Sequence, residues 1–594
     1  MDANITKAVD AWLGDSAVAE SDKTEIRTLC ERGQGRELTD RFYQDLEFGT
    51  GGMRGVIGAG LNRMNIYTVG AAAQGIASYI AKQGAAAKQA GVAIAHDSRR
   101  MSVEFARRTA CVLAANGVTA YLFDALRPTP ELSFAIRHLH CTAGVVITAS
   151  HNPPEYNGLK AYWTDGGQVV PPHDKAIIAE VRGVGGFGNI RVADFDKAKS
   201  DGLIKVVGRD VDEVFLSAIQ ATCLSPDACR EQGEKLRIVY TPLHGTGCNL
   251  VPEALRRRGF QQVLTVPEQM NPDGDFPTVK SPNPEEAAAL TMAIELAKRE
   301  RAELVIATDP DADRMGIAVR RPDGEYELVN GNRIAALILD YICGQLKRTG
   351  RLPADAVMIT TIVSGDLMKE IARSYGVEVV EVLTGFKWIA EKLNKYDQEG
   401  SGGKPSKHFV FGAEESYGYL PCNLARDKDA VAASVFIAEA AAAAAAAGRT
   451  LHDVLADLFR KHGYYQEGAK SLTLPGKEGA DRIKALMHHL RKRPPKEIAG
   501  RGVVTIGDVQ TGEIKDNQGG VIKRYDLPKS DVLLFTLDDA TKVIARPSGT
   551  EPKIKFYILV REPGDDLNRA RQNADAKIKA VISDLDALAR NIGS

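Results

Sequence analysis

The sequence predicts a multidomain protein of the α/β class. Short apolar segments alternate with longer amphipathic segments through most of the chain, which is the pattern of strands and helices in α/β layers. The 594 residues exceed what one hydrophobic core holds, so about three to five domains are expected. The C-terminal part differs, because a β-rich stretch within residues 502–562 precedes one helix, and it predicts a separate α+β domain.

Five apolar runs and two longer amphipathic runs define the elements expected before that domain. The apolar runs end in polar residues, Gly or Pro, as strands do, and the longer runs repeat apolar residues every three to four positions, as helices do. The predicted strands span 91–99, 143–150, 236–245, 303–309 and 408–412, and the predicted helices span 102–117 and 332–348. The alanine-rich run 440–447 is a further predicted helix, because alanine has the lowest cost in a helix.

Polar side chains lie at the ends of several predicted strands. These side chains are Asp97, Ser150, His244 and Asp309. Ligands of α/β sheets collect beyond the carboxyl ends of the strands, so we expect a binding site among these residues.

The composition argues against nucleic-acid-binding and membrane proteins. The formal net charge is −1, so no overall field attracts nucleic acid or an anionic membrane. No run of about 18 apolar residues occurs, and the N-terminal residues lack the pattern of a signal peptide. The eight cysteines contain no CxxC pair, which fits reduced thiols. We therefore expect a soluble, cytoplasmic protein.

The segment GVVITASHNPPEYNGLK, residues 144–160, places Ser150 at the end of a predicted buried strand. The two prolines that follow constrain the loop, and they lack the backbone N–H groups that a following helix would use. Ser150 is a candidate nucleophile, and His151, Asn152 and Lys160 are near enough in sequence to reach the same pocket. An ordinary turn or cap serine is the alternative.

The segment ELVIATDPDADRMGIAV, residues 303–319, carries Asp309, Asp311 and Asp313 between two apolar runs. Alternate residues of an extended segment face the same way, so these three carboxylates would repel one another. A hard divalent cation relieves the repulsion, and a donor set of oxygen alone favours magnesium or calcium over zinc. A solvated acidic turn is the alternative.

The segment ARPSGTEPKIKFY, residues 545–557, is typical of a phosphate-binding turn. Arg546 offers two parallel N–H donors, while Ser548, Gly549 and Thr550 offer hydroxyls and closely spaced amides. An ordinary turn between strands is the alternative. No GxxxxGK[ST] sequence occurs, which argues against a nucleoside triphosphate site of that type.

Two further loops carry candidate substrate contacts. In FGAEESYGYLPCNLARDKDAV, Glu414 and Ser416 suit sugar hydroxyls, and Arg426 and Lys428 suit a phosphate; a solvated loop is the alternative. In FGTGGMRGVIG, Arg54 lies in a glycine-rich turn that lets a cation approach an anion, and a surface hairpin is the alternative.

In chain order, TASHNPPEYNGLK, DPDADR, GAEESYGY and RPSGTEPKIKFY resemble the four signature loops of the α-D-phosphohexomutase family. The resemblance runs from about residue 40 to the C-terminus. The stretches GTGGMRG, LTGFKWI and EESYGYLPCNLARDKDAVAAS are most similar to the branch that contains phosphoglucomutases and phosphopentomutases.

The resemblance implies a role for each loop. Ser150 would carry a phosphoryl group and, with Asp309, Asp311 and Asp313, would contact Mg²⁺. The candidate catalytic residues beside Ser150 are Lys160, Arg54 and His151, and the candidate substrate-binding residues are Glu414, Ser416, Lys387, Arg426, Lys428, Arg546, Ser548, Gly549 and Thr550. Lys160 is the expected acceptor of the sugar hydroxyl proton, with a pKa lowered by nearby Arg54 and Mg²⁺.

The resemblance also implies three related mixed α/β domains and a smaller C-terminal α+β domain around a central cleft. Gly- and Pro-rich or polar breaks lie near 183–208, 321–331 and 465–480. The expected domains are 1–205 with the phosphoserine loop, 206–323 with the metal loop, 324–467 with the sugar loop and 468–594 with the phosphate loop.

The implied activity is that of a phosphoglucomutase. Glucose 1-phosphate and glucose 6-phosphate would interconvert through a phosphoserine enzyme and glucose 1,6-bisphosphate, which would also act as activator. Phosphopentomutase or phosphomannomutase activity on the same scaffold is the alternative, and a metal-dependent phosphatase and a non-enzymatic sugar-phosphate sensor are hypotheses from other classes. The expected partner is a small sugar phosphate, and the expected assembly is a monomer or a homodimer.

Overall fold

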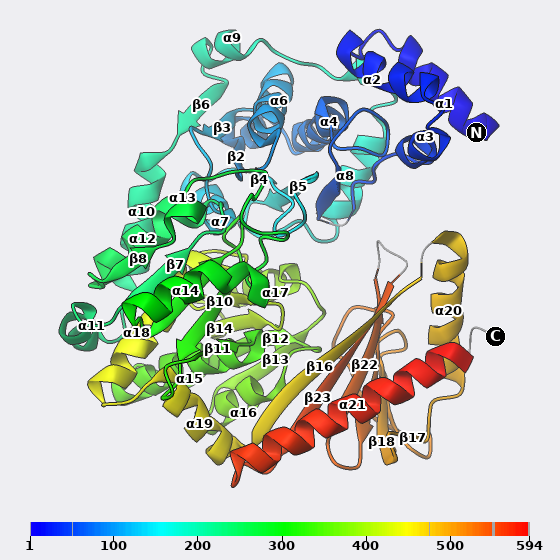
Figure 1. Ribbon diagram of the computed structural model, residues 1–594. Coiled ribbons are helices and arrows are strands. Elements are labelled where there is room, and N and C mark those ends of the chain that lie inside the picture. The colour runs from blue at the N-terminus through cyan, green and yellow to red at the C-terminus, as the bar shows by residue number, and fades with distance from the viewer. Residues whose placement is uncertain (1, 50, 475, 549–552, 592–594) are drawn as a thin grey trace. The chain divides into compact units, whose positions relative to one another are not determined.

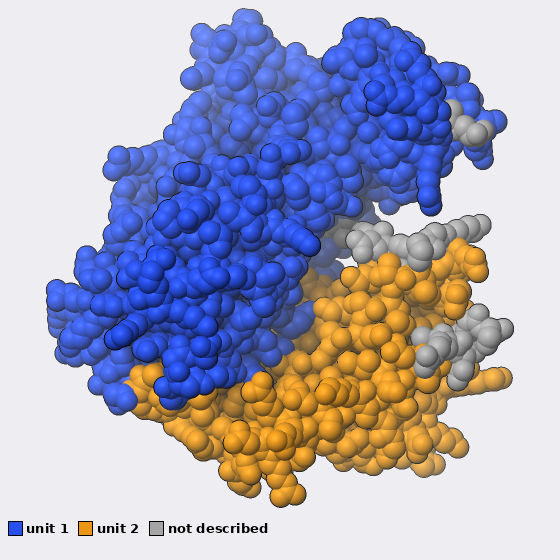
Figure 2. Space-filling view, in the orientation of Figure 1, with its two compact units in different colours: residues 1–334, 386–448 blue, residues 335–385, 449–594 orange. Residues whose placement is uncertain are grey.

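The computed structural model describes residues 2–49, 51–474, 476–548 and 553–591. These residues form two compact units (Figure 1, Figure 2). Unit 1 comprises residues 1–334 and 386–448, and unit 2 comprises residues 335–385 and 449–594. Both units combine helices with sheets, so the predicted α/β class is confirmed.

The first sheet of unit 1 has the strand order β1-β5-β4-β2-β3-β6. The four strands from β4 to β6 are parallel, and β5 and β1 continue the sheet in antiparallel pairing. The strands β2 and β4 are buried on both faces, which explains why their sequences are continuous apolar runs. The strands are β1 (Gly52–Val56), β2 (Val92–His96), β3 (Ala120–Phe123), β4 (Ala143–Ile147), β5 (Tyr156–Trp163) and β6 (Ile204–Val207). The helices are α1 (Ala3–Gly14), α2 (Glu20–Glu31), α3 (Gly35–Phe42), α4 (Ile66–Lys82), α5 (Ala85–Ala90), α6 (Ser102–Ala115), α7 (Thr129–His138), α8 (His173–Arg182), η1 (Phe187–Asn189) and α9 (Phe195–Ser200).

The second sheet of unit 1 has the strand order β11-β10-β9-β7-β8. A parallel part, β9-β7-β8, is extended by the antiparallel strands β10 and β11. The strands are β7 (Ile238–Thr241), β8 (Val263–Thr265), β9 (Leu304–Thr308), β10 (Met315–Arg320) and β11 (Tyr326–Val329). The helices are α10 (Arg209–Ala221), α11 (Pro226–Gly233), α12 (Gly247–Arg258), α13 (Pro267–Met270), η2 (Ala287–Leu290) and α14 (Thr291–Glu300). Unit 1 ends with α17 (Lys387–Glu399), the antiparallel pair β14 (His408–Glu414) and β15 (Gly418–Leu420), and α18 (Ala430–Ala446).

Unit 2 contains a parallel strand pair and the sheet-rich C-terminal part. The first segment holds α15 (Gly331–Arg348), β12 (Ala356–Thr361), α16 (Asp366–Ser374) and β13 (Glu378–Val382). The second holds α19 (Leu451–His462), β16 (Tyr464–Thr473), α20 (Gly476–Lys492), β17 (Glu497–Ile498), β18 (Arg501–Asp508), β19 (Glu513–Asp516), β20 (Val521–Arg524), β21 (Leu533–Leu537), β22 (Lys542–Pro547), β23 (Lys553–Glu562) and α21 (Leu567–Asn591). The sheet order is β16-β23-β22-β21-β18-β19-β20, and α21 lies along it over β16 and β23 (Figure 1).

The sheets extend past the three domain boundaries that the sequence suggests. Residue 205 lies inside β6, which pairs with β3 of the first sheet. Residue 323 lies in the hairpin that joins β10 to β11, and residue 467 lies inside β16, which pairs with β23. The three breaks contain strands as well as loops, since β6, β11 and most of β16 fall inside them, so the predicted domain boundaries stay a prediction.

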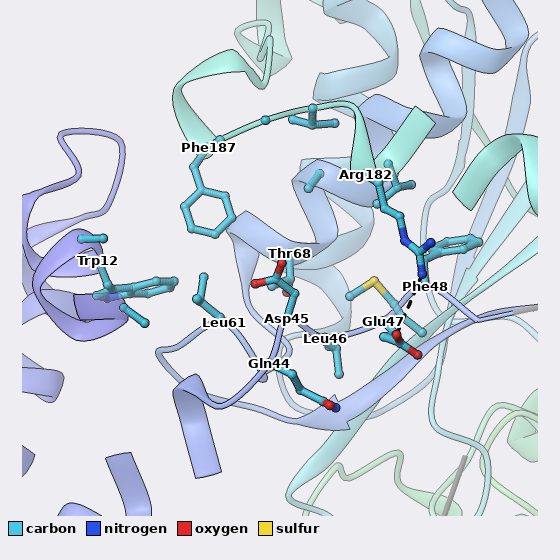
Figure 3. A pocket seen from close by; sticks show the side chains of 18 of the residues that line it. Trp12, Gln44, Asp45, Leu46, Glu47, Phe48, Leu61, Thr68, Arg182 and Phe187 are labelled. Atoms are coloured by element: carbon cyan, nitrogen blue, oxygen red, sulfur yellow. Dashed lines mark ion pairs between the residues drawn. The ribbon is translucent and has the colours of Figure 1, made fainter. Parts of the chain in front are cut away.

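A cavity of about 560 Å³ lies beneath the N-terminal helices of unit 1. Figure 3 shows Trp12 and Phe187 at one end of it and the ion pair between Glu47 and Arg182 at the other. The lining is mostly apolar, and none of the candidate site residues belongs to it. This cavity is therefore separate from the candidate site.

The helix α18 contains all but the last residue of the predicted alanine-rich helix 440–447 and is almost wholly buried. In the described part of the chain, no single helix is both long and apolar enough to cross a bilayer, and α18 and α19 reach that threshold only when counted together. The Asp429 side chain caps α18 and accepts a hydrogen bond from the Ala432 amide at 2.8 Å. Its other carboxyl oxygen is buried without a hydrogen-bond partner among the described residues, and burial raises the pKa of Asp429 to about 7.

This raised pKa makes stability depend on pH. Between about pH 4 and pH 7 the unfolded chain ionises at Asp429 while the folded chain keeps the proton, so stability is lost as the pH rises. Across this pH range, the free energy of unfolding of the native protein is expected to fall by on the order of 2–4 kcal/mol more than that of the Asp429→Asn variant. Urea denaturation at a series of pH values measures the difference. Parallel pH curves for the two proteins would contradict it. Asp453→Asn is the matched control, since the pKa of that helix-capping carboxylate is lowered and its contribution has the opposite sign.

Candidate active site

Ser150 lies in a strained backbone conformation just beyond β4. Its φ of +52° falls in the left-handed region, which a residue with a Cβ rarely adopts. The Ser150 amide donates to Thr148 Oγ1 at 2.8 Å, and the side chain is buried. Strain of this kind persists only where the surrounding contacts enforce it, and it concentrates at functional sites.

Arg99 holds this loop in place from the end of the neighbouring strand β2. Its guanidinium donates to the backbone carbonyls of Ser150, Asn152, Pro153 and Tyr156. The side chain is fully buried and also forms an ion pair of 3.3 Å with Asp97. One planar group with five donors thus fixes four successive parts of the loop, which a lysine could not do.

Arg99→Met is expected to lower the free energy of unfolding by about 3–5 kcal/mol, because it leaves the buried Asp97 carboxyl without its ion-pair partner. The adjacent Arg100 is the matched control. Its ion pair with Asp275 is more than half exposed, so Arg100→Met should leave stability unchanged within error. Urea denaturation of the two variants provides the comparison, and equal losses would show that Arg99 does not brace the loop.

The three aspartates meet in a tight turn between β9 and β10. Ala312 has a φ of +48° within this turn, and Asp309 Oδ1 accepts the amides of Asp313 and Arg314 at 3.1 and 3.0 Å. One oxygen from each aspartate lies within 4.8 Å of the others. The carboxylates therefore converge as predicted, although through a turn and not through the alternation of an extended segment.

A direct hydrogen bond joins the serine loop to the aspartate turn. Ser150 Oγ donates to Asp309 Oδ2 at 2.7 Å, and both side chains are buried. His151 Nδ1 lies 3.3 Å from the same hydroxyl. Burial, with the charges of Arg314 and Arg54, lowers the pKa of His151 to about 3, so its imidazole is neutral at physiological pH. The serine hydroxyl thus has two acceptors within reach.

Two lysines neutralise the aspartates. Lys160 Nζ lies 2.7 Å from Asp311 Oδ2 and 3.2 Å from Asp313 Oδ2, and Lys428 Nζ lies 3.2 Å from the same Asp313 oxygen. Burial opposes the charge of Lys160, but the two carboxylates outweigh it and raise the lysine pKa. The lowering expected from Arg54 and Mg²⁺ stays a prediction, because the two carboxylates that raise the Lys160 pKa are themselves the candidate metal ligands.

The aspartates fit a hard divalent cation. Burial and the charges of its two neighbours raise the pKa of Asp309, whereas Lys160 and Thr129 overcome burial and lower the pKa of Asp311. Burial also opposes ionisation of Asp313, but Lys428 and Lys160 lower its pKa. Asp311 Oδ1 and Asp313 Oδ1 are buried and accept no hydrogen bond from the described residues. Two anionic oxygens therefore retain free lone pairs for a metal.

Glu414 and Lys428 extend the cluster from a third segment. Glu414 ends β14, and its Oε1 lies 4.0 Å from Lys428 Nζ. Burial raises the pKa of Glu414 to about 7 even though Lys428 opposes the shift. Ser416 lies two residues further on, in the loop before β15. A Cβ at Gly418 would lie 2.2 Å from the Lys428 side chain, so this close approach requires glycine.

The other basic candidates of unit 1 lie in different settings. Arg54 is on β1 and donates to Asn152 Oδ1 at 2.9 Å, which places it on the serine loop. Lys387 begins α17, and burial lowers its pKa. Arg426 is buried and contacts Asp397 of α17 at 2.6 Å, so its guanidinium ties its loop to that helix. Substrate contact by Arg426 and Lys387 stays a prediction.

The predicted phosphate turn belongs to unit 2. Arg546 lies on β22 opposite Lys555 of β23, so two cations stand side by side at the end of the strands. Arg546 Nε is buried without a hydrogen-bond partner among the described residues. The Ser548 amide donates to the Lys553 carbonyl at 2.7 Å. Gly549 and Thr550 lie outside the described residues.

Three contributors to the site escaped the sequence analysis. Thr129 Oγ1 donates to Asp311 Oδ2 at 2.9 Å, Arg314 lies 3.8 Å from Asp313 Oδ1, and Arg99 braces the serine loop. Arg314 directly follows Asp313, and Arg99 is the last residue of the predicted strand 91–99, so both lay beside candidates that the sequence had identified. Thr129 begins α7 and carried no signal, because its role depends on a contact across 182 residues of sequence.

Comparison with known proteins gives one consistent family. Models of the phosphoglucomutase/phosphomannomutase α/β/α domains I, II and III match residues 45–184, 213–324 and 330–462. A phosphoglucomutase of Staphylococcus aureus strain MRSA252 is 38% identical over 558 residues, which cover 94% of this chain and 96% of the relative.

Solved structures show the same fold at lower identity. A phosphoglucomutase/phosphomannomutase family protein from Burkholderia thailandensis aligns with a TM-score of 0.61 at 18% identity, over 90% of this chain and 97% of its own. Parafusin, a phosphoglucomutase from Paramecium, aligns with a TM-score of 0.65 at 17% identity, over 93% and 95%. The three domain matches and the near full-length relative establish that this chain belongs to the phosphoglucomutase/phosphomannomutase family.

Proposed function

We propose that this protein is a phosphoglucomutase that interconverts glucose 1-phosphate and glucose 6-phosphate through a phosphoserine at Ser150. The observation that carries the proposal is the 2.7 Å hydrogen bond from Ser150 Oγ to Asp309, beside two further buried carboxylates. The 38% identity to proteins named phosphoglucomutase supports glucose as the sugar.

The aspartates Asp309, Asp311 and Asp313 are proposed to hold Mg²⁺ together with an oxygen at Ser150. The ion would neutralise charge on the phosphoryl group during transfer. Lys160 and Lys428, which contact the carboxylates directly, supply positive charge on the same side of the cluster. These residues therefore concentrate cations where a phosphoryl group and its equatorial oxygens would develop charge.

Each half of the proposed reaction moves one phosphoryl group and one proton. In the first half, the P–O bond to Ser150 breaks as a bond to the 6-hydroxyl of glucose 1-phosphate forms, which gives glucose 1,6-bisphosphate and a free serine. In the second half, Ser150 Oγ attacks the 1-phosphate and releases glucose 6-phosphate. Asp309 and neutral His151 are the acceptors within reach of the serine proton. Glu414, with a pKa of about 7, suits a sugar hydroxyl proton.

The bisphosphate must turn end for end between the two halves, so one site has to hold either phosphate while the other reacts. We assign that site to Arg546, Ser548, Gly549 and Thr550. The buried Arg546 Nε, which has no hydrogen-bond partner among the described residues, supports the assignment together with the charge of Lys555. Added glucose 1,6-bisphosphate should accordingly act as an activator, because it phosphorylates Ser150 in enzyme that has lost its phosphoryl group.

A side-by-side assay tests the substrate. The protein is incubated with Mg²⁺, a trace of glucose 1,6-bisphosphate and, separately, the 1-phosphates of glucose, mannose, N-acetylglucosamine and ribose. Glucose 1-phosphate is expected to give the highest kcat/KM. Preferential turnover of ribose 1-phosphate would reassign the enzyme as a phosphopentomutase, and release of inorganic phosphate at a comparable rate would indicate a phosphatase. We place the enzyme in the cytoplasm, which the eight free cysteines support.

A further inference from the structure

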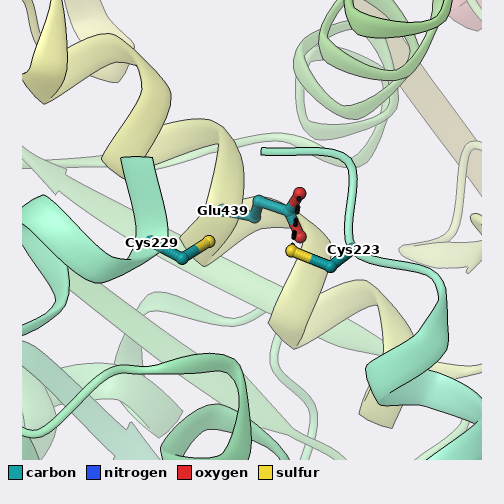
Figure 4. A group of neighbouring side chains, drawn as sticks. All are labelled: Cys223, Cys229 and Glu439. Atoms are coloured by element: carbon teal, nitrogen blue, oxygen red, sulfur yellow. Dashed lines mark hydrogen bonds between the residues drawn. The ribbon is translucent and has the colours of Figure 1, made fainter. Parts of the chain in front are cut away.

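A pair of cysteines lies in unit 1 at a place that the proposed reaction does not use. Cys223 follows α10, and Cys229 lies in α11, which packs against α18. Figure 4 shows both side chains pointing toward Glu439 of α18. The two sulfurs and a Glu439 oxygen lie within 4.8 Å of one another. Two thiols six residues apart in sequence are thus held next to each other in the fold.

The Glu439 carboxylate is already fully engaged. Oε1 accepts the amides of Leu224 and Ser225 at 2.6 and 2.7 Å and the Cys223 thiol at 3.6 Å, while Oε2 pairs with the buried Arg258. A metal ion at the two sulfurs would lie beside the Arg258 guanidinium and would compete for lone pairs that these donors use. The surroundings therefore favour thiol chemistry over cation binding.

The two thiols differ in reactivity. A hydrogen bond from Cys229 lowers the pKa of Cys223 to about 6 against the effect of burial, and the charge of Arg258 adds to the shift. The same hydrogen bond and burial raise the pKa of Cys229. Cys223 is partly exposed, whereas Cys229 is buried. The partly exposed residue of the pair is thus the one whose thiol pKa is lowered, and the second thiol is held next to it as a partner.

The remaining buried cysteines lack these properties. Burial raises the pKa of the thiols of Cys111, Cys141, Cys248 and Cys343, which keeps them protonated and unreactive. Burial likewise raises the pKa of Cys422. The environment of Cys223 is therefore distinct among the cysteines whose pKa is shifted.

We propose that Cys223 and Cys229 are a redox-active pair that a small-molecule disulfide such as glutathione disulfide converts into an intramolecular disulfide. The Cys223 thiolate attacks one sulfur of the oxidant, forms a mixed disulfide and releases one glutathione thiolate. Cys229 then loses its proton to solvent and attacks the Cys223 sulfur, which releases the second glutathione. In total, two protein thiols are oxidised and one glutathione disulfide is reduced to two glutathiones.

Peptide mapping of the full-length protein tests this proposal. Tryptic cleavage after Arg209 and Arg230 gives one peptide that contains both cysteines and no other. After incubation with glutathione disulfide and alkylation, this peptide is expected to weigh about 2 Da less than the unalkylated dithiol form, because two hydrogens are lost. Dithiothreitol before alkylation should restore two alkyl groups. Cys229→Ser should stop at a mixed disulfide on Cys223, and Cys223→Ser should leave Cys229 in the thiol form.

Cys30→Ser is the matched control, because Cys30 is the exposed cysteine and is the one that nonspecific oxidation would reach first. In this variant, the peptide that contains Cys223 and Cys229 should show the same mass loss of about 2 Da. Full alkylation of both cysteines after oxidant treatment would overturn the proposal. So would one equivalent of zinc that protects both thiols until a chelator removes it. The wild-type measurement needs no variant and no turnover, so its outcome is independent of the proposed function.

Discussion

Ser150→Ala is expected to lower turnover by at least about 10³-fold, which corresponds to about 4 kcal/mol in the barrier. The proposed reaction stores a phosphoryl group on this hydroxyl, and an alanine has no atom to carry it. The folded structure should survive, because the variant loses the hydrogen bond to Asp309, worth about 0.5–1.5 kcal/mol, and the longer contact with His151. The strained backbone is held by Arg99, which remains.

Steady-state kinetics and intact-mass spectrometry measure the two consequences together. The wild-type protein treated with glucose 1,6-bisphosphate should gain the mass of one phosphoryl group, and Ser150→Ala should not. Ser98→Ala is the matched control, since its buried hydroxyl has no hydrogen-bond partner in the described part of the chain and it lies at the end of the neighbouring strand β2. Persistent turnover, or a phosphoryl group on Ser150→Ala, would remove Ser150 as the carrier.

The secondary structure around the site was accessible from sequence because the strands are buried on both faces. Such strands are continuous apolar runs that end abruptly in polar residues, and the ends of β4 and β9 place Ser150 and Asp309 accordingly. The predicted helix 332–348 corresponds to α15, and all but the last residue of the alanine run lies within α18. The local sequence pattern was therefore enough to predict these strands and helices and the positions of Ser150 and Asp309.

Tertiary contacts explain what the sequence could not supply. Thr129 reaches Asp311, and the thiols of Cys223 and Cys229 reach Glu439, only because distant segments pack together. The same reason accounts for the raised Lys160 pKa, since sequence spacing does not show that carboxylates of Asp311 and Asp313 lie 2.7 and 3.2 Å from its ammonium group. Contacts between residues far apart in the sequence thus determine the electrostatics of the site. The local sequence pattern indicates most of the residues that make up the site.

Asp311→Asn is expected to remove most of the stabilisation by Mg²⁺ and to lower turnover by at least about 10³-fold. Its Oδ1 is one of the two buried oxygens of the three aspartate carboxylates that accept no hydrogen bond within the described part of the chain, and the substitution removes the charge of the side chain while keeping its shape. A ligand that binds only the folded state at 100 times its Kd stabilises that state by about 2.7 kcal/mol. The Tm of the wild-type protein should therefore rise as Mg²⁺ is added, and the Tm of the variant should stay nearly flat.

Asp427→Asn is the control for Asp311→Asn, because it changes a buried carboxylate that is not a proposed metal ligand. Asp427 accepts a hydrogen bond from the Tyr162 hydroxyl at 2.7 Å and contacts Lys428 at 3.1 Å, but it is not one of the three converging aspartates. Its variant should keep the Mg²⁺-dependent rise in Tm even if activity changes. An equal rise in Asp311→Asn and the wild-type protein would mean that the cation binds elsewhere. The three carboxylates would then serve only to hold Lys160 and Lys428 beside the serine.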